Sequence, residues 1–479
     1  MNPFDEQCRC QARRAFLQKS STGLGAVALA SLMNGTARAD DALTVPGALK
    51  TLHWAPKAKR VIYLFMSGAP SHLDLFDPKP KLIEMTGKDL PESVRQGQRI
   101  TTMTSGQKNL LCVGSPFKFE KYGKAQMDLS ELLPYTSKIV DECLWIKTMF
   151  TEPINHDPAV TFFNTGHQQP GRPTMGAWAS YGLGGANQNL PAYVVMNSGG
   201  GGQPLQSRYW GNGFLPAQHG GCQFRSDGDA VLYLSNPPGI APEARRRMLD
   251  TTNGLNKLAL ADLGDPAISA QIENYELAFR MQSSVPELMD LSKEKKETLD
   301  LYGATPGRGS FANNCLLARR LAERGVRFIQ LNHRDWDHHG GLPGGIKGKC
   351  KETDQASAAL VMDLKQRGML DDTIVMWGGE FGRTAYSQGN IQPNNFGRDH
   401  HPRCFTMWMA GGGVKAGYVH GETDDFGYNT VRDGVHVHDL HATLLHLLGV
   451  DHKKMTYRHE GRDYRLTDIA GNVVKELLA

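Results

Sequence analysis

The chain has 479 residues, of which 40% are hydrophobic and 21% are charged, and its formal net charge is +4. This length and composition allow one large or two medium domains with a sizeable buried core. No block of lysine and arginine is interleaved with aromatic residues, which argues against nucleic acid as a partner.

The N-terminal 39 residues have the pattern of a twin-arginine export signal. Arg13 and Arg14 precede a weakly apolar run at 23–32, and an A-x-A cleavage motif ends at Ala39. The alternative interpretation is an ordinary amphipathic helix. No later run approaches the roughly 18 apolar residues that span a bilayer. We therefore expect the twin-arginine export machinery as a partner, cleavage after Ala39, and a mature protein (40–479) that is periplasmic or secreted.

The chain contains eight cysteines, two of which fall in the leader. The other six are widely scattered and show no C-x-x-C spacing: Cys112, Cys143, Cys222, Cys315, Cys350 and Cys404. An oxidising compartment permits disulfides, but this pattern does not define their pairing.

Predicted strands and helices alternate along the mature chain. The first strand is the continuous apolar run at 60–66, which ends at Ser67 and Gly68 and is typical of a buried central strand. Further strands are expected at 143–148, 192–196, 326–331, 373–377 and 404–409, and helices for example at 354–366 and 439–448. This alternation indicates an α/β fold with a central, largely parallel sheet flanked by helices.

The segment from Gly199 to Gly303 interrupts the alternation. It begins with a glycine-rich stretch and becomes helical and charged from Ala241 onward. Its short basic run at 245–247 is more typical of a solvated helix face than of a binding patch. We interpret the segment as a helical insertion or cap on the α/β body.

Histidines and carboxylates gather directly after several predicted strands. His72 and Asp74 follow the first strand, a cluster at 333–339 follows another, and Glu380 follows a third. Sites in α/β sheets form where loops leave the carboxyl ends of strands. Imidazole with carboxylate suits zinc, whereas carboxylate-rich sets suit calcium, magnesium or manganese. The clusters contain no cysteine, so they favour a catalytic metal site over a closed structural one; three solvated polar loops are the alternative.

Several motifs carry a resemblance to a known family. They are GAPSHLDLFDPKP (68–80), RPTMGAWASYGLG (172–184), WDHHG (336–340), GGEFGRT (378–384), GRDHH (397–401), MAGGGVKAGYVHGETD (409–424) and the tail HDLHATLLHLLGV (438–450). Through them the chain resembles the alkaline phosphatase and sulfatase superfamily, most closely the sulfatase-like DUF1501 group. The resemblance covers nearly the whole mature chain and implies an alkaline phosphatase/sulfatase-like sandwich.

The resemblance also implies a set of metal ligands. Asp335 and His339 match the family's Asp-x-x-x-His pair, and Asp337 is an equally good carboxylate. Glu380 matches the second acidic ligand, with Glu replacing the usual Asp. The late histidine is matched by His400 or by the neighbouring His401. Asp74 is the nearest candidate for the acidic ligand after the first strand, although a loop-capping carboxylate is an alternative for it.

The nucleophile departs from the sulfatase pattern. The C-x-P-S-R motif that supplies formylglycine is absent, and His156 of NHDPAVTFFNTG (155–166) stands where the cysteine would be. His156 is a candidate nucleophile, general base or metal ligand, or is merely hydrogen-bonded at a helix start. Thr174 is a second hydroxyl candidate, but its position before an apolar helical run favours a helix N-cap. Arg383 either holds sulfate or phosphate oxygens or neutralises Glu380.

A second group of histidines follows near the C-terminus: His436, His438, His441 and His446. His438 and His441 are three residues apart, on one face of a predicted helix. No feature of the sequence connects them to the strand-end clusters, so structural roles are favoured.

The leading expectation is an exported, metal-dependent hydrolase of sulfate or phosphate esters, small or polysaccharide. It would use a divalent ion (zinc, calcium, magnesium or manganese) to activate the ester and water. A non-catalytic, metal-stabilised envelope or glycan-binding protein is the alternative. A metallopeptidase or deacetylase is disfavoured because no H-E-x-x-H motif occurs.

Overall fold

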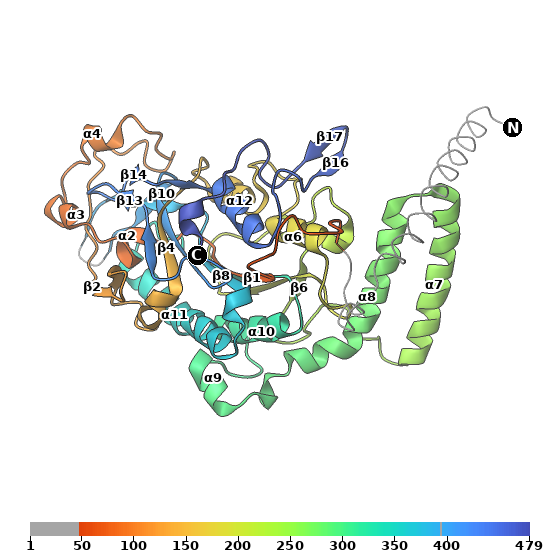
Figure 1. Ribbon diagram of the computed structural model, residues 1–479. Helices are drawn as coiled ribbons and strands as arrows, with labels where there is room; N and C mark the ends of the chain where they lie inside the picture. Colours follow the sequence, from red (N-terminus) through yellow and green to blue (C-terminus); the bar gives the residue numbers. More distant parts are fainter. Residues whose placement is uncertain (1–46, 393–394) are drawn as a thin grey trace.

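The computed structural model describes residues 47–392 and 395–479. The expected leader and its cleavage motif lie outside these residues. A nine-stranded sheet forms the centre of the molecule, in the order β12-β4-β11-β8-β1-β7-β5-β6, with β15 also paired to β4 (Figure 1). The strands of this sheet are β1 (Arg60–Met66), β4 (Cys143–Phe150), β5 (Tyr193–Ser198), β6 (Cys222–Phe224), β7 (Phe328–His333), β8 (Thr373–Gly378), β11 (Phe405–Ala410), β12 (Tyr418–His420) and β15 (Val435–His436).

The sheet is mostly parallel, as the alternation of elements predicts. The five strands from β8 to β6 pair in parallel, whereas β11 runs antiparallel to both β8 and β4. Consequently β1, β4, β7 and β8 all point their carboxyl ends at the same edge of the sheet. All six strands expected from the sequence are present. The α/β class is therefore confirmed.

Strand β1 shows why the sheet is covered on both faces. Its alternate residues Ile62, Leu64 and Met66 enter one hydrophobic core, and Val61, Tyr63 and Phe65 enter another. Successive side chains of a strand point to opposite faces, so a strand that is apolar from Val61 to Met66 is buried on both.

Two layers of helices supply those cores. One face packs against α10 (Phe311–Glu323) and α11 (Leu342–Gln366). The opposite face packs against α5 (His156–Thr165), α6 (Met175–Leu183) and α12 (Val437–Leu447). Both helices predicted from the sequence are present, and α11 begins twelve residues earlier than the predicted 354–366.

Smaller elements surround the body. They are the short helices α2 (His72–Leu75), α3 (Pro80–Glu84), α4 (Glu92–Arg95) and α9 (Lys296–Tyr302), and the two-stranded sheets β2 (Phe119–Tyr122) with β3 (Met127–Ser130), β9 (Gly382–Ser387) with β10 (Arg398–His401), β13 (Glu422–Thr423) with β14 (Thr430–Arg432), and β16 (Tyr457–His459) with β17 (Arg462–Tyr464). The β9–β10 pair was not expected, because its strands are polar and carry no hydrophobic alternation.

The segment from Gly199 to Gly303 contributes to two parts of the molecule. Strand β6 extends the main sheet beside β5. Helices α7 (Pro242–Leu263) and α8 (Pro266–Met289) pack on each other and project from the body as a hairpin (Figure 1). Among the described residues, no helix combines the length and apolar character needed to cross a membrane.

Candidate metal centre

Four side chains converge at the carboxyl edge of the sheet. They are His156, Asp337, His339 and His400, and their ligand atoms all lie within 4.8 Å of one another. His156 begins α5 after β4, Asp337 and His339 follow β7, and His400 lies in β10 just before β11. The cluster forms because the segments that follow several strands leave the sheet at the same edge.

Asp337 is the common partner of the three histidines. Its Oδ2 lies 3.1 Å from His156 Nε2, and its Oδ1 lies 2.8 Å from His339 Nε2 and 3.4 Å from His400 Nε2. Burial alone would raise the pKa of Asp337, but hydrogen bonds from the three histidines and the charge of Arg383 outweigh it and hold the pKa far below its usual range. Asp337 is therefore a carboxylate at neutral pH.

Glu380 orients His156 from behind. Its Oε1 lies 2.6 Å from His156 Nδ1, and the amide of Gly68 donates to both carboxylate oxygens, at 3.1 and 3.3 Å. Burial by itself lowers the pKa of His156, but hydrogen bonds to Asp337 and Glu380 outweigh it and raise the pKa above the ordinary value. A carboxylate on one ring nitrogen fixes the orientation of the other, as in many histidine metal sites. Glu380, expected as a direct ligand, thus stands one layer outside the cluster.

His400 is fixed through the same kind of arrangement. Its Nδ1 lies 2.7 Å from the carbonyl oxygen of Ile154, which leaves Nε2 facing the cluster. Its ring lies 4.3 Å from that of His156 and 4.7 Å from that of His339, centroid to centroid. Burial, together with the charge of Arg383, lowers the pKa of His400 to about 4. A neutral imidazole is the form that binds metals.

The donor set fits a divalent ion. Three imidazole nitrogens and one carboxylate suit zinc, manganese or iron, whereas calcium and magnesium prefer oxygen ligands alone. Within the described part of the chain, the buried His156 Nε2 has no hydrogen-bond partner of good geometry, although Asp337 Oδ2 lies 3.1 Å away. Ligands about 2.1 Å from a tetrahedral ion lie roughly 3.4 Å apart, so shifts below about 1 Å would complete the site.

Arg383 holds the centre together from within. Its Nε donates to the carbonyl of Ala69 at 2.9 Å, Nη1 to that of Arg398 at 3.2 Å, and Nη2 to Gly68 O and, at 2.6 Å, to Asp337 Oδ1. The side chain is only 1% exposed. Arg383 therefore neutralises Asp337, where the sequence left open a role on Glu380 or on the substrate.

Two other predicted metal ligands, Asp74 and His401, have partners outside the cluster. Asp74 is fully buried, and its Oδ2 accepts from Arg398 Nε at 2.7 Å and from Ser71 Oγ at 2.5 Å. His401 Nε2 lies 2.5 Å from the carbonyl of Tyr428. Both are outside the four-residue cluster and already have strong partners.

Asp335 and Thr174 also lie away from the cluster. The backbone of Asp335 has φ +77°, and its carboxylate lies 3.5 Å from Lys349 Nζ. Thr174 is the N-cap of α6: its hydroxyl accepts from the amide of Ala177 at 3.4 Å and donates to Gly211 O at 3.1 Å. The favoured capping role of Thr174 is therefore observed.

Some contributions to the centre leave no signal in the sequence. The Gly68 amide and the Ile154 carbonyl are backbone groups, which no residue type reveals.

Asp399, which follows Arg398 in GRDHH, accepts from the hydroxyls of Thr101 and, at 2.6 Å, Thr104. That carboxylate ties the loop at 101–104 to β10.

The fold and this centre define an α/β protein with a candidate mononuclear metal site at the carboxyl edge of its sheet. The chain belongs to DUF1501, a family described as proteins of unknown function, whose model matches residues 58–478. The search of curated proteins gave no match.

The solved structures that resemble this chain in part include the following three. Ps i-CgsB in complex with k-i-k-neocarrahexaose is 12% identical, with a TM-score of 0.34, over 82% of this chain and 72% of that one. The lipoteichoic acid synthase LtaP from Listeria monocytogenes is 9% identical, with a TM-score of 0.31, over 86% and 76%. Alkaline phosphatase from the Antarctic bacterium TAB5 is 12% identical, with a TM-score of 0.30, over 83% and 99%. Similarities at this level do not bear on the chemistry of the site.

Proposed function

We propose that this protein is an exported, metal-dependent hydrolase of sulfate or phosphate esters that works without a formylglycine. The observation that carries the proposal is the convergence of His156, Asp337, His339 and His400 at the carboxyl edge of the sheet. Asp337, His339 and His400 would hold the ion. A bound divalent ion would supply Lewis-acid activation of the ester and of water.

His156 has the geometry of a group that can hold or move a proton at Nε2. Glu380 accepts a hydrogen bond from Nδ1 of His156, so Nε2 of His156 faces the centre. In that position it serves as a fourth ligand or receives the proton of the attacking water. The side chains of Asp337 and His339, which are 12% and 24% exposed, give the centre its opening to solvent.

The decisive experiment compares His339→Ala with His338→Ala. Both residues lie in one loop, but only His339 belongs to the cluster. Purified protein is assayed on aryl sulfates, phosphate monoesters and phosphate diesters, and its metal content is measured. We expect His339→Ala to lose both activity and metal while His338→Ala keeps them. Hydrolysis and metal content unchanged in His339→Ala would refute the proposal.

A second candidate is a non-catalytic, metal-stabilised protein of the cell envelope that binds glycans. The contacts of Arg383 favour this candidate. Its guanidinium donates to three backbone carbonyls and to Asp337, which leaves few donors for a substrate oxygen. Stoichiometric metal without turnover on any of the three ester classes would select this candidate.

Export is tested separately. Arg13→Lys combined with Arg14→Lys is expected to keep the protein inside the cell, since the twin-arginine pair is read by its receptor. Cell fractionation and immunoblotting measure this. Unchanged export of the double variant would contradict the assignment.

A further inference from the structure

We infer that a basic pocket beside the metal centre binds a second anionic group of the substrate, so that the protein acts on polyanionic molecules such as multiply sulfated or phosphorylated saccharides. This inference rests on the proposed function for its catalytic part. The pocket, called here the Arg99–Arg403 pocket, has a volume of about 330 Å³ and is lined by Gln98, Arg99, Thr151, Ile154, Pro402 and Arg403, among others.

The pocket shares a wall with the centre. Ile154 lines the pocket, and its carbonyl oxygen lies 2.7 Å from Nδ1 of His400. Arg403 follows His400 by only three residues, and Thr151 is joined to the same stretch by its amide, which donates to Pro402 O at 2.9 Å. The pocket and the centre are therefore neighbours, with Ile154 and the His400 ring between them, and the inference is that one extended substrate contacts both.

The charge of the pocket is suited to an anion. The side chains of Arg99 and Arg403 are exposed, and within residues 47–392 and 395–479 neither makes an ion pair or hydrogen bond. The carboxylate in the lining, Glu152, is already engaged by His436 Nε2 at 2.8 Å. A free guanidinium presents paired donors that match two oxygens of a sulfate, phosphate or carboxylate.

Two buried polar atoms in the lining lack partners. Thr151 is only 4% exposed, yet among the described residues neither its Oγ1 nor Gln98 Oε1 has a hydrogen-bond partner. Buried polar atoms are nearly always hydrogen-bonded, so unpaired ones indicate a missing partner. The Thr151 hydroxyl donates to an anionic oxygen, and Gln98 Oε1 accepts from a hydroxyl. A saccharide that carries charged groups offers both.

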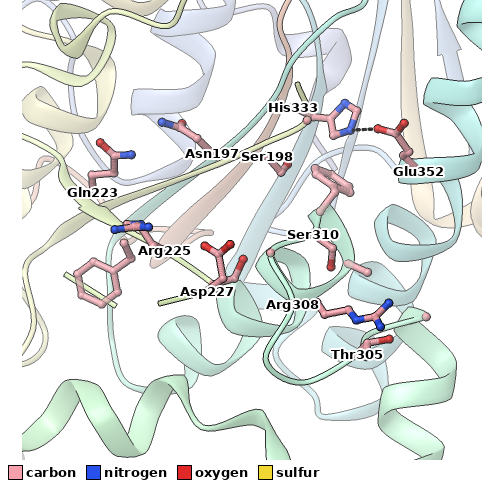
Figure 2. Close-up of a pocket in the computed structure, with 17 residues that line it drawn as sticks. Asn197, Ser198, Gln223, Arg225, Asp227, Thr305, Arg308, Ser310, His333 and Glu352 are labelled. Carbon is pink, nitrogen blue, oxygen red and sulfur yellow. Dashed lines mark hydrogen bonds and ion pairs between the residues drawn. The ribbon is translucent and has the colours of Figure 1, made fainter. Parts of the chain in front are cut away.

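The pocket continues into a second depression of about 590 Å³, with which it shares Gln98, Phe150 and Arg403. This continuity favours an extended ligand over a single small ion. By contrast, the larger pocket of about 740 Å³ in Figure 2 combines Arg225 and Arg308 with Asp227 and Glu352, so its lining is balanced in charge. That pocket supplies a matched control.

The test measures binding of a dextran sulfate oligomer, with unsulfated dextran as the reference, by titration calorimetry on the metal-loaded protein. We expect Arg99→Gln with Arg403→Gln to weaken dextran sulfate binding at least about tenfold, and Thr151→Val to weaken it about threefold or more. The control variant, Arg225→Gln with Arg308→Gln, changes the same number of charges and is expected to leave dextran sulfate binding unchanged. Unsulfated dextran should bind weakly to every variant.

Three outcomes overturn the inference: unchanged binding in the Arg99/Arg403 variant, equal losses in the control pair, or equal affinity for unsulfated dextran. Failure of the proposed function is seen separately, as no turnover of a small aryl ester by the wild-type protein. If small esters are hydrolysed, the Arg99/Arg403 variant should lose the wild type's preference for the polyanion over the small ester.

Discussion

The metal centre and the C-terminal helix α12 are both rich in histidine, but their histidines have different partners. At the centre, His156, His339 and His400 surround the carboxylate of Asp337. In α12, His438 Nε2 lies 2.8 Å from Gly166 O, and His441 Nε2 lies 2.7 Å from Phe163 O. One set faces a buried charge, and the other faces backbone carbonyls.

The carbonyls that meet α12 explain its histidine spacing. Phe163 and Gly166 lie at the C-terminal end of α5, where carbonyls have no partner within the helix. Two histidines three residues apart lie on one face of α12 and satisfy two of these groups. Histidine density alone therefore does not identify a metal site. A shared carboxylate at the ends of several strands does.

The largest expected effect is that of Asp337→Ala. This change removes the partner common to all three histidines, so metal affinity should fall by at least about 100-fold, beyond the upper end of what changes in outer-shell groups cause. Metal content after gel filtration and calorimetric titration measure it, and circular dichroism checks the fold. His441→Leu is the control. If Asp337→Ala kept the wild-type affinity for the metal ion, the distinction drawn between the metal centre and α12 would be wrong.

Asp74→Asn tests a buried carboxylate that lies near the centre but belongs to the scaffold. Its partner Arg398 is 0% exposed, so the change leaves a buried charge without its counter-ion. We expect a loss of about 3–5 kcal/mol in the free energy of unfolding, measured with urea, with metal content retained in the folded protein. Glu422→Gln, which breaks an exposed pair with Arg432, should change stability by less than about 1 kcal/mol. Loss of metal from folded Asp74→Asn would make Asp74 part of the centre.

Glu380→Gln should produce an intermediate effect. The variant keeps the shape of the side chain but loses the charge that orients His156, so metal affinity is expected to fall about 10- to 100-fold. Calorimetric titration measures the affinity. In the metal-free protein, NMR of the imidazole should show a lower pKa for His156, because Glu380 raises it. An unchanged affinity would contradict the role of Glu380 in orienting His156 toward the ion.

The smallest effect is expected for His441→Leu, which leaves Phe163 O without its donor. We expect a loss of about 1–3 kcal/mol in unfolding free energy at neutral pH, with normal metal binding. Burial lowers the pKa of His441 from 6.5 to about 3. The unfolded chain therefore binds more protons between these values, and stability falls as the pH drops below 6.5, by up to about 1.4 kcal/mol per pH unit.

Urea unfolding at pH 7.5, 6 and 5 measures this dependence. The variant lacks the titrating group, so its unfolding free energy should fall less steeply with acidification than that of the wild type. Parallel curves for the two proteins would show that burial in α12 does not lower the pKa of His441.

The sequence by itself determined the sheet and the edge at which the site lies. A continuous apolar run such as 61–66, bounded by Gly and Pro, is typical of a strand covered on both faces, and parallel strands bring their following loops to one edge. The residue types after those strands also restricted the chemistry to imidazole and carboxylate.

The tertiary structure decided which of these residues meet. Asp335 and Asp337 are equivalent in the sequence, but the backbone of Asp335 turns to φ +77° and its carboxylate lies beside Lys349, whereas Asp337 faces the histidines. Glu380 and Asp74 are carboxylates of the same kind, yet one orients His156 and the other pairs with Arg398. Hydrophobic periodicity specifies strands and faces. The direction of a loop side chain depends on local backbone turns and on partners distant in the sequence, which periodicity does not encode.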